Sequence, residues 1–337
     1  TTFLMMRLFI TFWKSFPASP SYSYKLLLSV ILLFTFVQSS QPLSSRVLPL
    51  RLLQNVRMST TSDPTSSSLT NESLSKFRSI VQTFQANRFQ PSNIFTASEH
   101  YQTIVGSGAL SVKLNGGNPP RPFKTTTEAF DTPDGDVFEV DYTENFEASD
   151  DVVIILHGLE SSPKGILVTR FATAFLDKGF GCCLFGFRGC NGNPPKTPGG
   201  YHVGFTQDVS QLVDTLHLRY PNKRFYLCGF SLGGNVSLKF LGELGEKAIE
   251  KNIYGGAVTC VPFDPAGCQR KIDSGINRLI YSSNFLTTLK VKAEEQHKTF
   301  PGSFDIDGVR SAKSIGDFDE AYIAKIYGFE DKFDYYR

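Results

Sequence analysis

Short apolar runs alternate with amphipathic segments between residues 152 and 261, and this alternation constrains the fold more than any other feature of the chain. The runs contain no charged residue; they are Val152–Leu156, Cys182–Phe187, Phe225–Cys228 and Ala257–Val261. Continuous apolar runs of this length are typical of strands that are buried on both faces of a sheet. With helices predicted between them, the chain belongs to the α/β class, with a mostly parallel sheet and helices on both faces.

The segments between the runs repeat apolar residues at helical spacing. They predict helices around Leu167–Phe175, Val209–Leu216 and Leu232–Leu241. Upstream, Ala129–Tyr142 contains the turn sequence Thr-Pro-Asp-Gly at residues 132–135, which has proline and glycine where a β-turn favours them. The alternation of apolar and polar residues on the turn's C-terminal side predicts an antiparallel hairpin that supplies the first two strands.

A G-x-S-x-G pattern lies where the third apolar run ends and a helix begins. In the sequence Gly229-Phe230-Ser231-Leu232-Gly233, the serine would occupy a sharp strand-to-helix turn that needs small residues two positions away. The turn would expose the Ser231 hydroxyl at the carboxyl edge of the sheet and direct the backbone N–H of Leu232 toward an oxyanion. We therefore predict that Ser231 is a nucleophile. The alternative is a glycine-rich helix start without chemistry.

A second motif follows the first apolar run. His157-Gly158-Leu159 stands where a fold of this class needs its other oxyanion donor. Gly158 permits close approach of the backbone, and the N–H of Leu159 is the candidate donor. Because His157 would end a strand, we expect it to support the loop by hydrogen bonds and not to act as a base.

With these motifs on hand, the chain resembles the α/β-hydrolase superfamily, and within it the YheT-type branch of esterases and lipases. The matching stretches are Glu99–Ile104, Thr132–Asp136, Leu156–Glu160, Phe187–Gly192, Tyr201-His202, Gly229–Asn235, Pro262–Asp264 and Asp334–Arg337. The resemblance covers residues 89 to 337 and implies the α/β-hydrolase fold. It also implies a triad in the order serine, acid, histidine, with the acid after the seventh strand and the histidine after the eighth.

The triad acid and the triad histidine are not identified in the sequence. The hairpin and the four runs supply six strands, so we expect both groups, and the last strands, beyond Arg337 and expect residues 1–337 alone to be inactive. The histidines present are His100, His157, His202, His217 and His297. None of them is favoured as a substitute: His202 lies in a predicted loop of structural role and His217 on the solvated side of a helix. Asp264, Asp317 and Asp319 are weak candidates for the acid.

The six cysteines indicate neither a metal site nor a disulfide framework. Cys182 and Cys183 are adjacent in a predicted strand, so they should face opposite sides of the sheet as core residues. The other cysteines show no C-x-x-C spacing, so we expect no zinc, and nothing in the sequence calls for a cofactor.

Residues 1–62 differ from the rest in having six basic residues and no acidic residue, and the whole chain has a net charge of +2. Residues 63–337 therefore carry −4, which argues against nucleic acid as a partner. Leu26–Val37 is a run of about a dozen mostly apolar residues, short for a membrane span but typical of a signal-peptide core, and Gln41–Ser62 has a transit-like composition. We predict a signal, a transit peptide or a single-pass anchor, unless Met58 is the true start. The expected location is an endomembrane or, after cleavage, a plastid or mitochondrion.

These observations divide the chain into residues 1–62, a linker with a short amphipathic helix over residues 63–88, and a hydrolase domain over residues 89–337. The domain includes a cap-like segment, residues 262–337, in which Phe285, Leu286 and Leu289 could line an acyl pocket. We predict a carboxylesterase or lipase that cleaves acyl esters through an acyl-enzyme on Ser231. The resemblance implies lipid or medium-chain esters. The alternatives are an acyltransferase that uses the same serine and a non-catalytic protein that binds a lipid or a partner.

Overall fold

The computed structural model describes residues 122–337, which belong to one compact unit. The predictions for the N-terminal signal or anchor, the amphipathic helix, His100 and the boundaries near residues 62 and 88 lie outside the described residues. Within residues 122–337, no helix is both long enough and apolar enough to cross a membrane.

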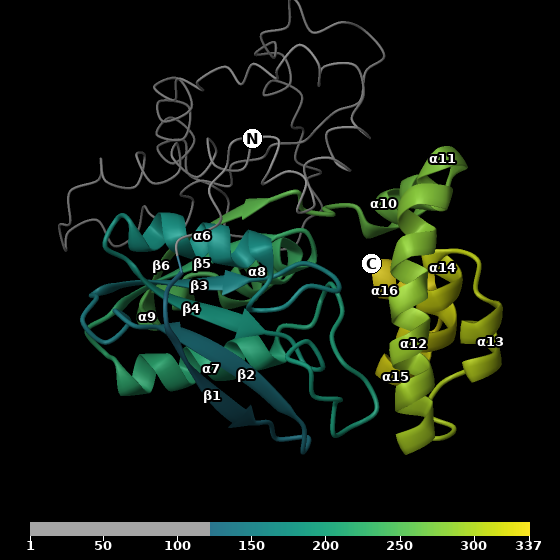
Figure 1. The fold of residues 1–337 in the computed structure, drawn as a ribbon, viewed down its shortest axis with the longest axis horizontal. Coiled ribbons are helices and arrows are strands. Elements are labelled where there is room, and N and C mark those ends of the chain that lie inside the picture. The colour runs from purple at the N-terminus through teal and green to yellow at the C-terminus, as the bar shows by residue number, and fades with distance from the viewer. Residues whose placement is uncertain (1–121) are drawn as a thin grey trace, which may run out of the picture. The chain divides into compact units, whose positions relative to one another are not determined.

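A six-stranded sheet forms the centre of the described part (Figure 1), in the order β1-β2-β4-β3-β5-β6. The strands are β1 (Thr125–Asp131), β2 (Val137–Thr143), β3 (Asp151–Leu156), β4 (Gly181–Gly186), β5 (Arg224–Phe230) and β6 (Ile253–Thr259). β2 pairs antiparallel with β1 and β4, and the remaining neighbours are parallel. The predicted α/β class with a mostly parallel sheet is confirmed.

The hairpin between β1 and β2 forms as its turn sequence predicts. The N–H of Gly135 donates to the carbonyl of Thr132 over 2.9 Å. Gly135 has a φ of 87°, in the left-handed region that glycine enters without steric cost. The turn sets the register in which Thr125 pairs with Thr143.

Helices cover both faces of the sheet. They are α6 (Ile166–Leu176), α7 (Gln207–Arg219), α8 (Leu232–Leu244) and the short α9 (Lys247–Glu250). α7 and α8 pack with Ile154 and Cys183 in one buried cluster, and α6 packs with Ile155 and Cys182 in another. The two adjacent cysteines therefore do face opposite sides of the sheet, as predicted.

The sixth strand differs from its prediction. It spans Ile253–Thr259, earlier than the expected 257–261, and only Ile253 and Val258 are buried in it. The first half of the strand was not predicted because it contains Gly255 and Gly256, and glycine contributes no side chain to an apolar pattern. Cys260 has a φ of 56° and ends the strand before the last two expected residues. β6 lies at the edge of the sheet, where five of its seven residues are half-buried.

After β6 the chain forms a helical segment, Pro265–Tyr336. Its elements are α10 (Pro265–Ile272), α11 (Gly275–Asn277), η2 (Arg278–Ser282), α12 (Ser283–Thr299), α13 (Ile306–Ser311), α14 (Ile315–Phe318), η3 (Asp319–Ile323), α15 (Ala324–Tyr327) and α16 (Lys332–Tyr336). The segment has a core of its own that includes Leu286 and Phe318, with Leu289 packed against it. Leu286 and Leu289, two of the residues suggested from the sequence to line an acyl pocket, therefore lie in or against this core. Figure 1 shows the helical segment beside the sheet and its helices.

Candidate active site

Ser231 stands directly between β5 and α8, with φ 54° and ψ −127°. A positive φ is uncommon for a residue with a side chain and is retained where the surrounding structure enforces it. Here the Ser231 N–H donates to the Thr259 carbonyl over 2.9 Å, and its carbonyl accepts from the Asn235 N–H over 3.1 Å. The backbone is thus held from β6 on one side and by the first turn of α8 on the other. The predicted sharp strand-to-helix turn is present.

The two glycines of the motif are required by close backbone contacts. A Cβ on Gly229 would lie 2.4 Å from the carbonyl oxygen of Gly233. A Cβ on Gly233 would lie 2.3 Å from the carbonyl oxygen of His157. No side chain fits at either distance, so the spacing of the motif follows from the tightness of the turn and from its packing against the end of β3.

The loop after β3 lies against the serine. A Cβ on Gly158 would be 3.2 Å from the Cβ of Ser231, so this glycine allows the two backbones to approach. Leu159 follows in a half-buried position, and Leu232 is buried at the start of α8. The structure therefore brings the two predicted motifs together. The use of the Leu159 and Leu232 amides as oxyanion donors stays a prediction.

His157 is buried, and both of its ring nitrogens have partners. Nε2 accepts the backbone N–H of Phe187 over 3.2 Å, so Nδ1 carries the proton and donates to the Gly158 carbonyl over 2.8 Å. Burial lowers the pKa of His157 to about 4, which keeps the ring neutral. His157 has no free lone pair with which to take a proton from Ser231, and it joins the end of β3 to the end of β4.

Glu160, the next residue of the loop, is held by two distant side chains, an arrangement that we call the Glu160 clamp. Its φ is 56°, unusual for a glutamate. Its N–H donates to the Tyr201 hydroxyl over 3.0 Å, and its carboxylate lies 2.9 Å from the Nζ of Lys292 on α12. The helical segment thus contacts the residue directly after Leu159. The sequence analysis missed both Tyr201 and Lys292 as contributors to this loop.

The Ser231 side chain is partly exposed, and its hydroxyl makes no hydrogen bond to any residue that the structure describes. His202 packs among Phe205, Tyr327 and Tyr335, and its Nδ1 accepts the Gly204 N–H over 3.1 Å. Burial lowers its pKa to about 4. This environment matches the structural role expected for the loop.

Two further histidines lie on helices. His217, expected on a solvated surface, is half-buried, and its Nδ1 is buried without a partner. The Nδ1 of His297 is likewise buried and unpartnered.

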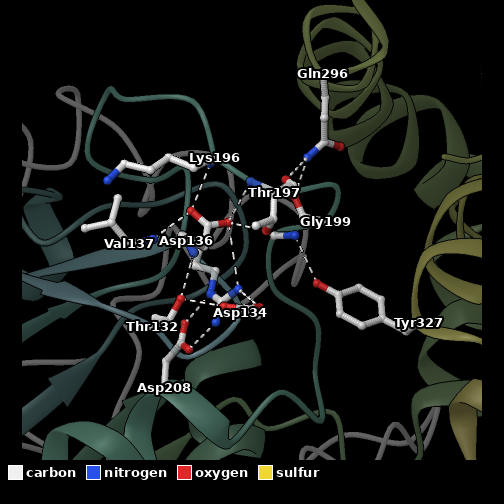
Figure 2. A network of polar contacts seen from close by, with 12 residues as sticks. Thr132, Asp134, Asp136, Val137, Lys196, Thr197, Gly199, Asp208, Gln296 and Tyr327 are labelled. Carbon is white, nitrogen blue, oxygen red and sulfur yellow. Dashed lines mark hydrogen bonds and ion pairs between the residues drawn. The ribbon is translucent and has the colours of Figure 1, made fainter. Parts of the chain in front are cut away.

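The buried side chain of Arg188 lies close to three acidic side chains near the loop that carries Tyr201. Its Nε and Nη2 donate to both oxygens of Asp208, over 2.7 and 2.6 Å, and its Nη1 donates to Asp134 over 2.6 Å. Asp136 lies 3.8 Å from the same Nη1. Figure 2 shows Asp136 beside the loop at Thr197, with Asp134 close by and Asp208 on the other side of Thr132. The sequence analysis quoted Asp134, Asp136 and Arg188 within matching stretches but assigned them no role.

The same network reaches the helical segment. Asp136 accepts the Lys196 N–H over 3.0 Å and the Thr197 hydroxyl over 2.6 Å. Gln296 on α12 donates to the Gly199 carbonyl. Further along the loop, the Gly200 N–H donates to the Tyr327 hydroxyl over 2.9 Å. Residues 196–201 are therefore held from both sides, and Tyr201 reaches Glu160 from a fixed position (Figure 2).

The weaker acid candidates have local roles. Asp264 caps α10 by accepting the Gly267 N–H over 2.8 Å, and Asp317 accepts the Lys313 N–H over 2.9 Å. Burial raises the pKa of Asp319 to about 7, and it accepts the Tyr336 hydroxyl over 2.6 Å. Within residues 122–337, no cluster of three or more His, Cys, Asp or Glu side chains could hold a metal ion, and the six cysteines are all free thiols.

A cavity of about 990 Å³ opens beside α8 and β6, and residues from the end of the chain complete its wall. Asn235, Lys239, Tyr254 and Tyr335 are among its lining residues, and Ser231 is not. The candidate site is therefore defined by the turn at Ser231 and the loop at Gly158, and not by this cavity.

The family model of the alpha/beta hydrolase fold matches residues 151–303. Phospholipase ABHD3 of Mus musculus is 27% identical over 222 residues, which cover 64% of this chain and 53% of that protein. The putative esterase YheT of Escherichia coli is 28% identical over 62% of each chain. The monoacylglycerol lipase of Saccharomyces cerevisiae is 27% identical over 57% of this chain and 44% of its own length.

The chain thus spans about half the length of the curated relatives it matches. Among solved structures, an esterase of Pyrococcus furiosus is 27% identical with a TM-score of 0.36, covering 45% of this chain and 61% of that one.

Proposed function

We propose, since this chain belongs to the α/β-hydrolase superfamily, that it contributes Ser231 as the nucleophile of a serine hydrolase that cleaves acyl esters. One observation carries the proposal: Ser231 has the positive φ of a strand-to-helix turn, and the backbone at Gly158 lies against it. A serine in a glycine-rich helix start without a chemical role would not need a strained backbone or a second loop at van der Waals distance.

The proposed reaction has two steps. Ser231 Oγ attacks the acyl carbonyl while its proton passes to a base, and the N–H groups of Leu159 and Leu232 stabilise the oxyanion. The bond to the alcohol then breaks, the leaving alcohol oxygen takes the proton from the base, and water hydrolyses the acyl-serine ester to give the acid and free Ser231. His157 is not the base, because its two ring nitrogens are occupied by Gly158 and Phe187. Its role is to hold the loop that carries the Leu159 amide.

The proposed substrates are lipid esters. The names of three relatives support this class, since they are a phospholipase, an esterase and a monoacylglycerol lipase. Transfer of the acyl group to an alcohol would use the same serine. A panel of a phospholipid, a monoacylglycerol and a medium-chain ester, assayed with and without an added acceptor alcohol, separates these possibilities. Free fatty acid as the main product supports hydrolysis, whereas the acylated acceptor as the main product supports transfer.

Labelling by an active-site phosphonate tests the nucleophile. The full-length protein should react covalently with a fluorescent fluorophosphonate, and Ser231→Ala should abolish the label. Ser283→Ala, at an exposed serine of α12, is the matched control and should label like the wild type. Equal labelling of the wild type and Ser231→Ala would refute the proposal. An unlabelled wild type that still binds lipid would favour a non-catalytic, lipid-binding protein.

A further inference from the structure

The helical segment ends in an apolar tip formed by residues 271–282. Within it, Ile276 is 57% and Leu279 is 75% exposed. The two residues are three positions apart, with Ile276 in the short α11 and Leu279 in η2. Figure 1 shows α11, which contains Ile276, at one extremity of the helical segment. Leu286, further along the same segment, is buried in its core, whereas Ile276 and Leu279 are exposed to solvent.

Basic side chains surround this tip. Between residues 271 and 290 there are three basic residues, Lys271, Arg278 and Lys290, and one acidic residue, Asp273. The Asp273 carboxylate is directed inward, where it accepts backbone N–H groups at the start of α14 over 2.9 and 3.0 Å. Three cations, Arg278, Lys290 and Lys313, line a shallow cleft together with Leu279 and one acidic residue, Asp273. The tip therefore presents apolar groups among cations.

We propose that this tip inserts Ile276 and Leu279 into the surface of a lipid bilayer that carries anionic headgroups. Aliphatic side chains gain most when they enter the boundary between headgroups and acyl chains, and nearby lysines and arginines are attracted to anionic lipids. The tip is a small projecting feature. A stable protein partner would need a face of roughly 800 Å² on this chain, whereas a bilayer accepts two protruding side chains without a matching cavity.

The proposal goes beyond the serine chemistry and does not depend on it. It gives the helical segment a second role, which is to hold the hydrolase domain at a lipid surface. Because the N-terminal apolar run of the full chain could also bind lipid, vesicle binding alone does not test the tip. A probe at the tip itself is needed.

A single tryptophan provides that probe. The chain has one tryptophan, Trp13, and Trp13→Phe removes it. In that background, Leu279→Trp places the fluorophore on the tip, and Leu218→Trp places it at an equally exposed position, 78% exposed, on α7. Both full-length variants are mixed with vesicles of brominated phosphatidylcholine, with or without phosphatidylglycerol, and emission is recorded.

The Leu279→Trp variant should show a blue shift and quenching on vesicles that contain phosphatidylglycerol, and Leu218→Trp should show neither. Adding Arg278→Glu should weaken the partitioning of the tip about tenfold, since each basic residue near the surface contributes appreciably. Vesicle-bound protein with unquenched emission from Leu279→Trp would overturn the proposal, as would equal quenching of the two variants or a failure to bind vesicles. Both variants also carry Ser231→Ala, so the vesicle phospholipids are not hydrolysed and the outcome is independent of that of the phosphonate labelling.

Discussion

Replacement of Arg188 by leucine tests how far the buried charge network stabilises the fold. The side chain of Arg188 is 6% exposed and that of its bidentate partner Asp208 is 2% exposed. Arg188→Leu would leave the Asp208 carboxylate in the interior without its two strongest donors, at 2.7 and 2.6 Å. Removing one member of a buried ion pair typically costs about 3–5 kcal/mol of unfolding free energy. We expect a loss in this range.

A matched control isolates the effect of burial. Arg224 makes the same two-pronged contact with Asp151, at 2.7 Å for each bond, but these side chains are 40% and 31% exposed. Exposed pairs contribute about 0–1 kcal/mol, so Arg224→Leu should have a small effect. Both variants and the wild type are unfolded in urea. Their unfolding free energies are compared with one common value for the dependence of the free energy on urea concentration.

The double variant Arg188→Leu/Asp208→Leu completes the experiment. It removes both charges together, so its loss of unfolding free energy should be smaller than the sum of the losses in Arg188→Leu and Asp208→Leu. Asp136, which keeps the N–H of Lys196 and the hydroxyl of Thr197, stays satisfied in every variant. If Arg188→Leu lost no more stability than Arg224→Leu, the reasoning from burial would be wrong.

Two further variants test the contacts around the candidate site. Lys292→Met removes the ion pair of the Glu160 clamp. Because a misplaced donor that acts in the transition state lowers kcat, kcat for ester hydrolysis should fall roughly tenfold with little change in KM. Lys292→Arg should restore kcat, and an unchanged kcat in Lys292→Met would contradict a positioning role. His202→Phe removes a histidine whose pKa falls from 6.5 to about 4 on burial. The unfolded state then binds more protons below pH 6.5, so between pH 7.5 and pH 5 the wild type should lose about 2 kcal/mol more unfolding free energy than the variant. Parallel pH profiles in urea would refute this.

The features that the sequence predicts correctly are those imposed by local geometry. A buried strand needs a continuous apolar run, and β3 and β4 therefore appear in the sequence almost at their true boundaries. The turn at Ser231 tolerates no side chain at positions 229 and 233, because contacts of 2.4 and 2.3 Å exclude even a methyl group. Such restrictions act on neighbouring residues, so their traces remain readable in the order of the amino acids.

The features that escape prediction depend on contacts between distant parts of the chain. Arg188 pairs with Asp208, 20 residues away in the sequence, and Lys292 pairs with Glu160, 132 residues away. Nothing in the local pattern distinguishes these charged residues from solvated ones. Arg188 does follow the end of the buried strand β4 in a matching stretch, and a charge at the end of a buried strand was a signal that could have been used.

The Glu160 clamp connects two parts of the molecule that sequence reasoning treated separately. Leu159 must keep its N–H in one orientation to serve an oxyanion, yet the next residue has a φ of 56°, which costs about 1–3 kcal/mol for a residue other than glycine. The contacts that offset this cost come from outside the loop: the Tyr201 hydroxyl accepts the Glu160 N–H, and Lys292 on α12 pairs with the Glu160 carboxylate. The position of the helical segment therefore bears on the geometry of the candidate active site through Lys292. A lipid surface that holds the proposed tip at Leu279 would act on the same helical segment that supplies Lys292 to Glu160.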